Sequence, residues 1–204
     1  MRWLGLVLLL CVAGDGVAGA LYLVPDYNPK PKYPRELQRA GISGEVQIGL
    51  TILADGSVSQ VRVLESTHPG FDEEAKAVIS QWRFKSWAVD ADTQAEVEVV
   101  APMRFSLDLD LPLDVNQWLS RLLCREITQY TVNTPRSSWV DTTPFHYTRG
   151  YLSNVFHRGQ LPETERLALI ATLNASVPDI VDRCREHPSL KYKRVVPAEI
   201  RKLL

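Results

Sequence analysis

The sequence predicts an α+β fold in the front half of the chain, a small three-stranded antiparallel sheet with helices, followed by an all-α, disulfide-stapled helical domain. Apolar residues recur at every second position in residues 44–52 and 97–109, and at helical spacing in residues 115–130. The charge balance also changes, because residues 21–111 carry 9 basic and 14 acidic side chains and residues 112–204 carry 13 and 9. We therefore expect a Pro-rich lead-in at residues 21–32, a first domain at 33–110 and a helical domain at 113–204.

The overall composition excludes some classes of protein. With 204 residues, 45% of them hydrophobic, the chain has enough apolar material for one or two globular domains. Its formal net charge of -1 argues against the broad basic surface of a nucleic-acid-binding protein. We expect no nucleic-acid partner.

Residues 1–20 are predicted to be a signal peptide. Arg2 supplies a positive start, residues 4–13 are an apolar run, and a triplet of small residues ends at Ala20. We expect cleavage after Ala20 and export to the periplasm, with no membrane span left in the mature protein. The alternative is an uncleaved anchor in the inner membrane, but residues 14–16 interrupt the run well short of the ~20 apolar residues that a span needs.

The front half begins with an extended segment and a short helix. Residues 25–34 hold four prolines, which favour a polyproline-like chain. Pro34 suits the first turn of a helix that continues to Ala40, and Gly41 is placed to end it.

Two strands joined by a hairpin are predicted next. From Gly44 the sequence alternates and places four apolar residues on one face: Val46, Ile48, Leu50 and Ile52. The dipeptide Asp55-Gly56 predicts the hairpin turn. The returning strand covers residues 57–64, and its broken alternation indicates a bulge.

A helix and a third strand complete this half. After the Pro69-Gly70 turn, apolar residues recur at helical spacing from Phe71 to Trp82, with three acidic residues in the first turn, where the helix dipole favours negative charge. Alternation returns from Val97 to Leu109. Pro102 cannot donate a ladder hydrogen bond, so it places this strand at an edge of the sheet.

Short motifs follow one another through residues 33–107. They are Tyr33-Pro34, Gly41-Ile42-Ser43-Gly44-Glu45-Val46, Asp55-Gly56 with Val58, Val61 and Val63, Ser66, Phe71-Asp72 with Ala75, Trp82-Arg83-Phe84, and Pro102-Met103-Arg104-Phe105. Together they resemble the TonB C-terminal domain. The resemblance implies a small three-stranded antiparallel sheet backed by helices. In the energy-transducing members, the last strand accepts an extended segment, the TonB box, from an outer-membrane transporter.

An edge strand can bind such a segment, because its unpaired N–H and C=O groups form hydrogen bonds with an added strand. We therefore predict an envelope-protein partner, with a TonB box as the candidate segment. The predicted partner-binding residues are Val97, Val99, Val100, Ala101, Met103, Arg104 and Phe105. The alternative is a protected edge, since Pro102 and nearby charges such as Glu96 and Glu98 are also devices against unwanted strand pairing.

Two departures from the family argue against energy transduction. Transducing TonB proteins keep an N-terminal membrane helix that contacts the ExbB–ExbD motor, and a long Pro-rich span across the periplasm. Here the first segment is predicted to be cleaved, and a ten-residue lead-in extends at most about 35 Å. Ser86 also follows the Trp82–Lys85 motif where the family often has proline. Partner binding alone is the function that the resemblance predicts.

The back half is predicted to be helical. A helical stripe runs from residue 115 to 130, residues 131–143 are typical of a loop, and Pro144 opens a second helix that Gly159 would end. A third helix is expected at residues 163–175. Ser176 and Pro178 suit the start of a fourth, and residues 197–204 form a last short helix.

Export determines how the cysteines are interpreted. Cys11 would leave with the signal peptide, so Cys124 and Cys184 would meet an oxidising compartment and are predicted to form a disulfide. Closing a loop of about 60 residues would stabilise the domain by roughly 4 kcal/mol on the chain-entropy model. A metal site is the competing interpretation, but the close Cys/His spacing that zinc needs is missing.

The helical half carries a second set of motifs. They are Cys124-Arg125-Glu126-Ile127, Gly150-Tyr151-Leu152, and Val177-Pro178-Asp179-Ile180-Val181 leading to Cys184 and Pro188. They resemble the HdeA family of periplasmic acid-stress chaperones over residues 115–200. This resemblance implies an alternative function, the protection of unfolded periplasmic clients in acid. Other disulfide-bonded helical families, such as the Rap/Tai immunity proteins, share the pattern, and a helical scaffold without chaperone activity is a further interpretation.

Candidate catalytic chemistry is sparse. The sequence contains no nucleophile elbow, phosphate-binding glycine loop or zinc signature, so we predict no catalytic residue, cofactor or metal. His68 near Asp72 and Glu73 is a candidate for a weak metal site, but helix capping and dipole roles explain the two carboxylates better. His146 and His157 are eleven residues apart, which is too far for a two-histidine metal clamp.

Overall fold

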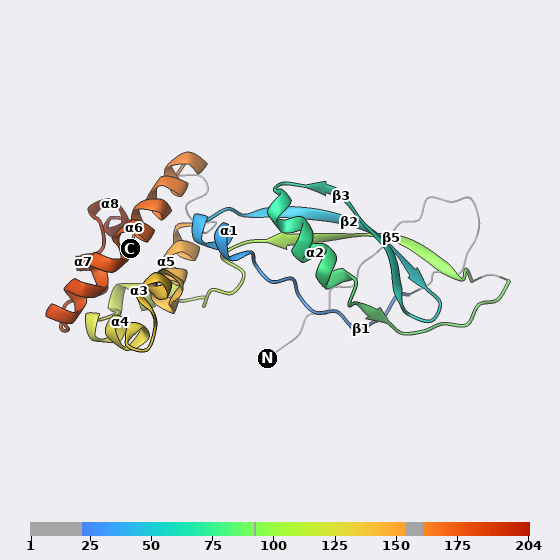
Figure 1. The fold of residues 1–204 in the computed structure, drawn as a ribbon, viewed down its shortest axis with the longest axis horizontal. Coiled ribbons are helices and arrows are strands. Elements are labelled where there is room, and N and C mark those ends of the chain that lie inside the picture. Colours follow the sequence, from blue (N-terminus) through green and yellow to red (C-terminus); the bar gives the residue numbers. More distant parts are fainter. Residues whose placement is uncertain (1–21, 92, 154–160) are drawn as a thin grey trace. The chain divides into compact units, whose positions relative to one another are not determined.

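The computed structural model describes residues 22–91, 93–153 and 161–204 (Figure 1). The predicted signal peptide at residues 1–20 lies outside the described residues, as do His157 and the predicted helix end at Gly159. The chain divides into two compact units. The first contains residues 45–103 and the lead-in before residue 33, and the second contains residues 33–44 and 104–204. The short stretch 33–44, predicted as the start of the first domain, thus groups with the helical unit.

The first unit is built on a three-stranded antiparallel sheet, as the sequence predicted. The strand order is β3–β2–β5, with β2 at Gly44–Leu53, β3 at Val58–Ser66 and β5 at Glu96–Phe105. The four apolar residues predicted to share a face of β2 are at most 1% exposed. On the other face Glu45 and Gln47 are exposed, but Gly49 is buried because the side chains of Arg62 and Leu64 lie over it.

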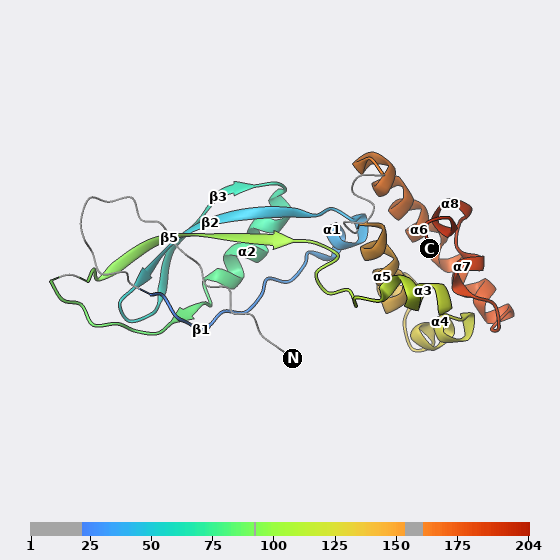
Figure 2. The same cartoon turned by 180° about the vertical axis from the view of Figure 1, so that it is seen from behind.

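One helix covers one face of this sheet. A 3-10 turn, η1 (Pro69–Phe71), leads into α2 (Asp72–Ile79), which packs against β3 and buries Ala75, Val78 and Ile79. Figures 1 and 2 view the unit from opposite sides and show α2 against one face only. The predicted helix from Phe71 to Trp82 ends three residues early, and the Trp82 indole instead donates a hydrogen bond to the Pro29 carbonyl at 3.1 Å.

The predicted bulge in β3 is confirmed, and a second one accompanies it. Between the pairs Gln47–Glu65 and Ile48–Val63, β3 contains one residue more than β2. The same happens between Gly49–Arg62 and Thr51–Ser59. Gln60, inside the second bulge, has a φ of 49°, which is rare for a residue with a side chain. The strand is therefore locally twisted and irregular.

Two strand predictions are corrected by the structure. The lead-in was expected to be a spacer, but β1 (Pro25–Tyr27) pairs with β4 (Arg83–Phe84) in a separate two-stranded ribbon. The third strand was expected to reach Leu109, but β5 ends at Phe105. Ser106 and Asp108 form a side-chain hydrogen bond that favours a turn, and Leu109 is 61% exposed.

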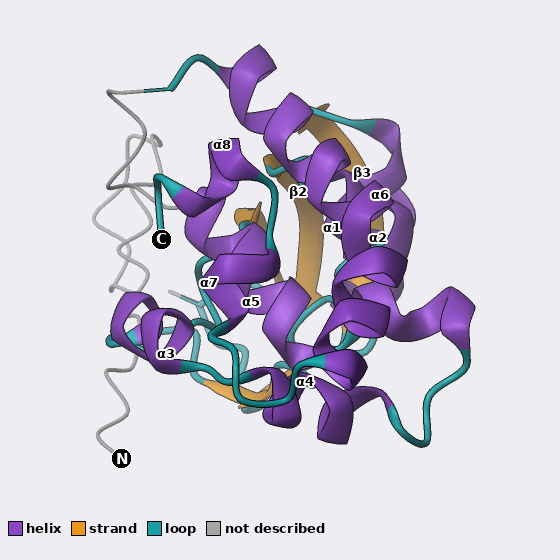
Figure 3. Ribbon diagram, turned by 90° about the vertical axis from the view of Figure 1, so that its left-hand side faces the viewer, coloured by secondary structure: helices purple, strands orange, loops and turns teal. Residues whose placement is uncertain are grey.

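The second unit is helical. Its elements are α1 (Arg35–Ala40), α3 (Val115–Arg121), α4 (Cys124–Thr131), the 3-10 helix η2 (Arg136–Asp141), α5 (Thr143–Leu152), α6 (Glu163–Glu186), α7 (Tyr192–Val195) and α8 (Ala198–Arg201). The long helix α6 packs against α4 and α5 (Figure 3). The predicted disulfide between Cys124 and Cys184 is present and joins α4 to α6, and both cysteines are fully buried.

Two helix predictions are wrong. The stripe at residues 115–130 is broken between α3 and α4, because the Leu122 carbonyl accepts a hydrogen bond from the Tyr192 amide at 2.8 Å and Leu123 bridges to Lys191. Conversely, the predicted third and fourth helices are one helix, α6, with Pro178 inside it. The Ser176 hydroxyl bonds back to the Thr172 carbonyl at 2.8 Å instead of capping. The helix continues because burial of an apolar stripe on both sides of Pro178 stabilises it by more than the lost hydrogen bond costs. The buried residues of this stripe are Ile170, Leu173, Val177, Ile180, Val181 and Cys184.

Gly56 provides a test of the predicted hairpin. Its φ is 85°, and a Cβ atom there would lie 1.9 Å from the Phe84 carbonyl oxygen. We expect Gly56→Ala to destabilise the first unit by more than the roughly 1–2 kcal/mol of a left-handed alanine, because the backbone of Phe84 must also move. Gly49→Ala is the control, since it meets only movable ends of Arg62 and Leu64 at 3.2 Å. Denaturant unfolding followed at the amides of β2 measures both variants, and equal losses would contradict the turn argument.

Candidate functional site

The outer edge of β5 is the first candidate site. In the order β3–β2–β5, this strand has a strand neighbour on one side only among the described residues. Its even-numbered residues from Glu96 to Arg104 are all exposed, whereas Val99, Ala101, Met103 and Phe105 are at most 9% exposed. Of the seven predicted partner-binding residues, only Val100 and Arg104 therefore present exposed side chains, and Val97 is half-buried. The edge position predicted from Pro102 is confirmed.

The position of a residue in β5 also determines to which side its main-chain N–H and C=O groups point. In an antiparallel ladder the N–H and C=O of one residue point to the same side, and those of the next residue point to the other side. Pro102 has no N–H and is compatible only with the side that β2 does not occupy. Glu96, Glu98 and Val100 share its parity, so their N–H and C=O groups also point to the open side.

The two edges of the sheet are unequal. The β3 edge contains two bulges and a residue with positive φ, which disrupt the regular row of donors and acceptors that an added strand needs. In β5, exposed and buried residues instead alternate strictly from Glu98 to Phe105. The β5 edge is the better template for strand addition.

The stretch that contains the sheet and α2 has more acidic than basic residues. Residues 45–103 include 4 basic and 10 acidic residues. Glu98 on β5 forms an ion pair with Arg62 on β3 at 3.5 Å, and the pair spans β2 above Gly49, which has no side chain to block it. The Glu98 side chain is still 69% exposed, so this pair neutralises it only weakly.

The second candidate site is the place where the helical unit holds α1. Arg35 and Arg39 on α1 both donate to the carboxylate of Asp141, which ends η2; the Arg39 contacts measure 2.7 Å. Two side chains of α6 bind the carbonyls at the end of α1: Asn174 donates to Arg39 at 2.7 Å and Arg166 to Gly41 at 2.9 Å. The two side chains thus supply hydrogen-bond donors to carbonyls that have no donor within the helix itself.

Gly41 permits this close approach. Its φ of 76° ends α1 in the left-handed conformation, as the sequence predicted. A Cβ atom at this position would lie 2.4 Å from the Ile170 side chain of α6. A helix of six residues is marginal on its own, so α1 depends on these contacts with the helical unit.

Charge is concentrated around Asp141. Hydrogen bonds from Arg39, and secondly from Arg35, lower the pKa of Asp141 from 3.8 to about 2 against an opposing effect of burial. Arg149 on α5 is fully buried, and burial lowers its pKa to about 10. Its Nη1 donates to the Val140 carbonyl at 2.7 Å and to Asn174 at 3.2 Å, while its Nε and Nη2 have no hydrogen-bond partner among the described residues. Asn174 thus connects Arg149 to α1.

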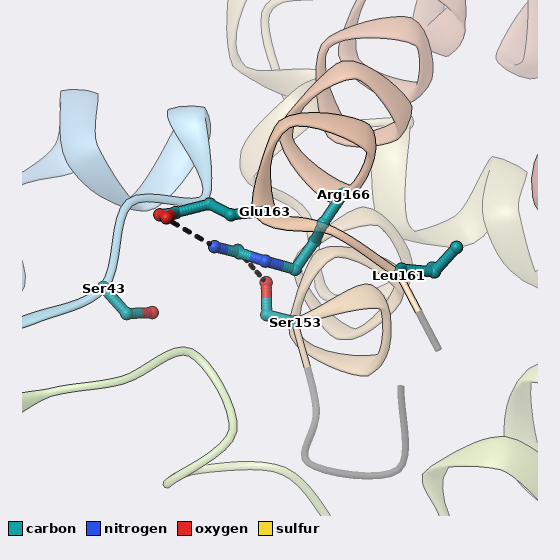
Figure 4. Close-up of a pocket in the computed structure, with 5 residues that line it drawn as sticks. All are labelled: Ser43, Ser153, Leu161, Glu163 and Arg166. Atoms are coloured by element: carbon teal, nitrogen blue, oxygen red, sulfur yellow. Dashed lines mark hydrogen bonds and ion pairs between the residues drawn. The ribbon is translucent and has the colours of Figure 1, made fainter. Parts of the chain in front are cut away.

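A small cavity lies beside this contact. Its volume is about 280 Å³, and its lining residues are Ser43, Ser153, Leu161, Glu163 and Arg166 (Figure 4). The Arg166 guanidinium points across it toward Ser153 and Glu163, each at 3.4 Å. Because the same guanidinium also binds the Gly41 carbonyl, the cavity belongs to the α1 contact, and its described lining residues leave no cation over for a ligand.

The remaining candidate groups have structural roles. His68 accepts a hydrogen bond from the Gly70 amide at 3.0 Å and caps η1. Asp72 and Glu73, for which the sequence suggested capping and dipole roles, lie in the first turn of α2. Across residues 22–91, 93–153 and 161–204, no three His, Cys, Asp or Glu side chains gather as a metal site would require. In the same part of the chain, no helix combines the length and the apolarity needed to cross a membrane.

Comparison with known proteins relates part of the chain to one family. Residues 29–107 match the family described as Gram-negative bacterial TonB protein C-terminal. Protein TonB of Pseudomonas aeruginosa is 41% identical over 56 residues, which are 27% of this chain and 16% of that protein. Protein TonB of Yersinia enterocolitica is 38% identical over 60 residues (29% and 24%), and protein tonB2 of Pseudomonas aeruginosa is 33% identical over 92 (45% and 33%). The matches thus span a third or less of these relatives.

Two solved structures are also similar to part of this chain. The solution structure of the Pseudomonas aeruginosa TonB C-terminal domain is 28% identical, covers 48% of this chain and 99% of that one, and has a TM-score of 0.38. The Helicobacter pylori TonB C-terminal domain is 30% identical, covers 40% and 85%, and has a TM-score of 0.32. The predicted likeness of residues 115–200 to HdeA stays a prediction.

The Asp141 contacts predict how acid affects α1. Because the pKa of Asp141 is lower in the folded chain than the unfolded value of 3.8, its ion pairs stabilise the fold at and above pH 4, and this contribution is lost as the pH falls toward 2. We expect Asp141→Asn to lower the stability at pH 7 by about 1 kcal/mol, a figure reduced for solvent screening. Amide exchange in α1 should accelerate in this variant.

Asp182→Asn is the matched control, since Asp182 also contacts two arginines, Arg136 and Arg185, but is 42% exposed. Asp182→Asn should lower the free energy of unfolding by less than half as much as Asp141→Asn, and amide exchange in α1 should stay unchanged. If both variants lose the same stability, or if the Asp141 effect persists at pH 2, the ion pairs do not hold α1.

Proposed function

We propose that this chain, whose residues 29–107 match the TonB C-terminal family, binds a protein of the bacterial cell envelope by adding an extended segment of it to the open edge of β5. The single observation that carries the proposal is the regular outer edge of β5, which has no strand partner in the part of the chain that the structure describes and ends a sheet whose other edge is bulged. The proposed role is binding, without catalysis. The proposed location is the periplasm, which is supported by the predicted signal peptide.

The partner segment is proposed to be a TonB box, or a strand of similar chemistry, in an outer-membrane transporter. The relatives reported above are TonB proteins, which supports a partner in the envelope. The proposal covers partner binding only and does not include energy transduction.

The expected affinity is modest. Each main-chain hydrogen bond contributes about 0.5–1.5 kcal/mol net, and the three open residues Glu96, Glu98 and Val100 offer about six such bonds. After the cost of ordering a free peptide, a dissociation constant on the order of micromolar to millimolar is expected. Such weak binding suits a contact that forms and releases repeatedly.

The second candidate function is acid-stress protection by the helical unit. The observation in its favour is the buried disulfide between α4 and α6, which connects the two segments that carry most of the HdeA-like motifs. On this hypothesis the chain should suppress the aggregation of an acid-unfolded client protein at pH 2–3 and change its oligomeric state between pH 7 and pH 2. A chain that protects no client and keeps one oligomeric state would exclude it.

Strand addition predicts a specific effect of proline in β5. Val100→Pro removes one N–H from the open side and leaves the β2 side intact, so we expect binding of TonB-box peptides to weaken about tenfold. Val100→Ala keeps the N–H and should change affinity less than threefold. The measurement is an NMR titration of the labelled chain, followed at the amides of residues 97–105.

The two variants at one position separate main-chain from side-chain binding. A control peptide with alternate N-methylated residues has the same side chains but lacks half of its donors, and it should not bind. If Val100→Pro and Val100→Ala bind equally well, the partner does not pair with the open side of β5.

A further inference from the structure

The open edge of β5 is divided by Pro102. N-terminal to it, Glu96, Glu98 and Val100 each direct a donor and an acceptor to the open side, by the alternation described above. At Pro102 only the carbonyl remains, so the carbonyl of an added strand opposite it finds no donor. An unpaired carbonyl buried by neighbouring strands is costly, and an added ladder is therefore expected to stop there.

The stretch before Pro102 is acidic on the side chains that a partner would meet. Residues with outward main-chain groups also have exposed side chains, so cross-strand neighbours of an added segment are Glu96, Glu98 and Val100. Val100 is 40% exposed and Glu98 69% in its side chain. Directly opposed residues on adjacent strands interact favourably when their charges are opposite and unfavourably when the charges are alike.

The two carboxylates are not equivalent. Glu98 already has Arg62 at 3.5 Å from the side of β3. Among the residues that the structure describes, no ion pair reaches Glu96, whose side chain lies at the start of the strand. A cation on an added segment thus gains most beside Glu96. The acidic composition of residues 45–103 increases the local attraction for such a segment.

We propose that the β5 edge accepts a short extended protein segment of about five residues that pairs with Glu96–Val100, ends opposite Pro102, and carries Lys or Arg rather than Asp or Glu at alternate positions. The inference rests on the strand addition proposed above and specifies its partner. The docking strip is the half of the edge before Pro102. An apolar residue opposite Val100 completes the match.

The test uses two seven-residue peptides in which Thr and Val alternate. Two alternate positions are replaced, by Lys in the first peptide and by Glu in the second. Titrated into the isotope-labelled full chain at low salt, both should shift the amides of Glu96, Glu98 and Val100. The Lys peptide should bind about tenfold more tightly, and added salt should reduce the difference.

Two substitutions that change the charge by the same amount test which residue is responsible for the preference for the Lys peptide. Glu96→Lys should reverse the preference between the two peptides. Glu65→Lys is the matched control, because Glu65 lies exposed on β3 at the other edge of the same sheet, and it should leave the preference intact. A reversal by both variants would show that net charge alone decides, and would overturn the role of Glu96.

Pro102→Val tests where the ladder stops. With the N–H restored, peptide-induced shifts should extend to Arg104 and the affinity should rise several-fold. An unchanged pattern of shifts would overturn the stop at Pro102.

The outcomes also separate this inference from the function on which it rests. If both peptides shift the β5 amides with equal affinity, strand addition stands and the charge selectivity is wrong. If neither these peptides nor TonB-box peptides shift any amide of β5, strand addition itself fails, and the inference fails with it.

Discussion

A strand that has a neighbour on one side only must leave half of its main-chain groups to water or to a partner. In β5 this constraint coincides with strict alternation, because the residues that turn their main chain toward β2 also bury their side chains. Their burial secures the strand without any contact at its outer edge. The remaining residues turn their main chain to the open side and expose their side chains, so an added segment can contact them without disturbing the core.

The region that matches the TonB family is not one compact unit in this chain. The matched residues 29–107 include α1, which groups with the helical unit. A six-residue helix gains little from its own hydrogen bonds. Asp141, Asn174 and Arg166 supply what it lacks, namely counterions for its arginines and donors for its last carbonyls. The helical unit thus stabilises a segment that the sequence alone assigns to the domain before it.

Local patterns predicted local structure well. Alternation identified β2 and β5, Gly41 and Gly56 marked turns through their positive φ, and Pro102 located the edge. Features decided by distant residues were missed. The break after Leu122 depends on the Tyr192 amide, and Pro178 stays inside α6 because a buried stripe continues past it. The Asp141 site was missed for the same reason, since its arginines lie about a hundred residues away, with a separation of 102 for Arg39.

Docking and protection were alternative interpretations of the β5 edge, but the structure makes them compatible. A proline removes one donor from an edge and so prevents a long strand from pairing along its whole length, which is the contact that leads to aggregation. Pro102 leaves the main-chain groups of Glu96, Glu98 and Val100 available to a partner strand. An edge of this kind excludes an indefinite ladder by geometry and distinguishes among short segments by the side chains beside it. On the same strand, Pro102 therefore limits the length of the segment that can pair, and Glu96 selects the charge of that segment.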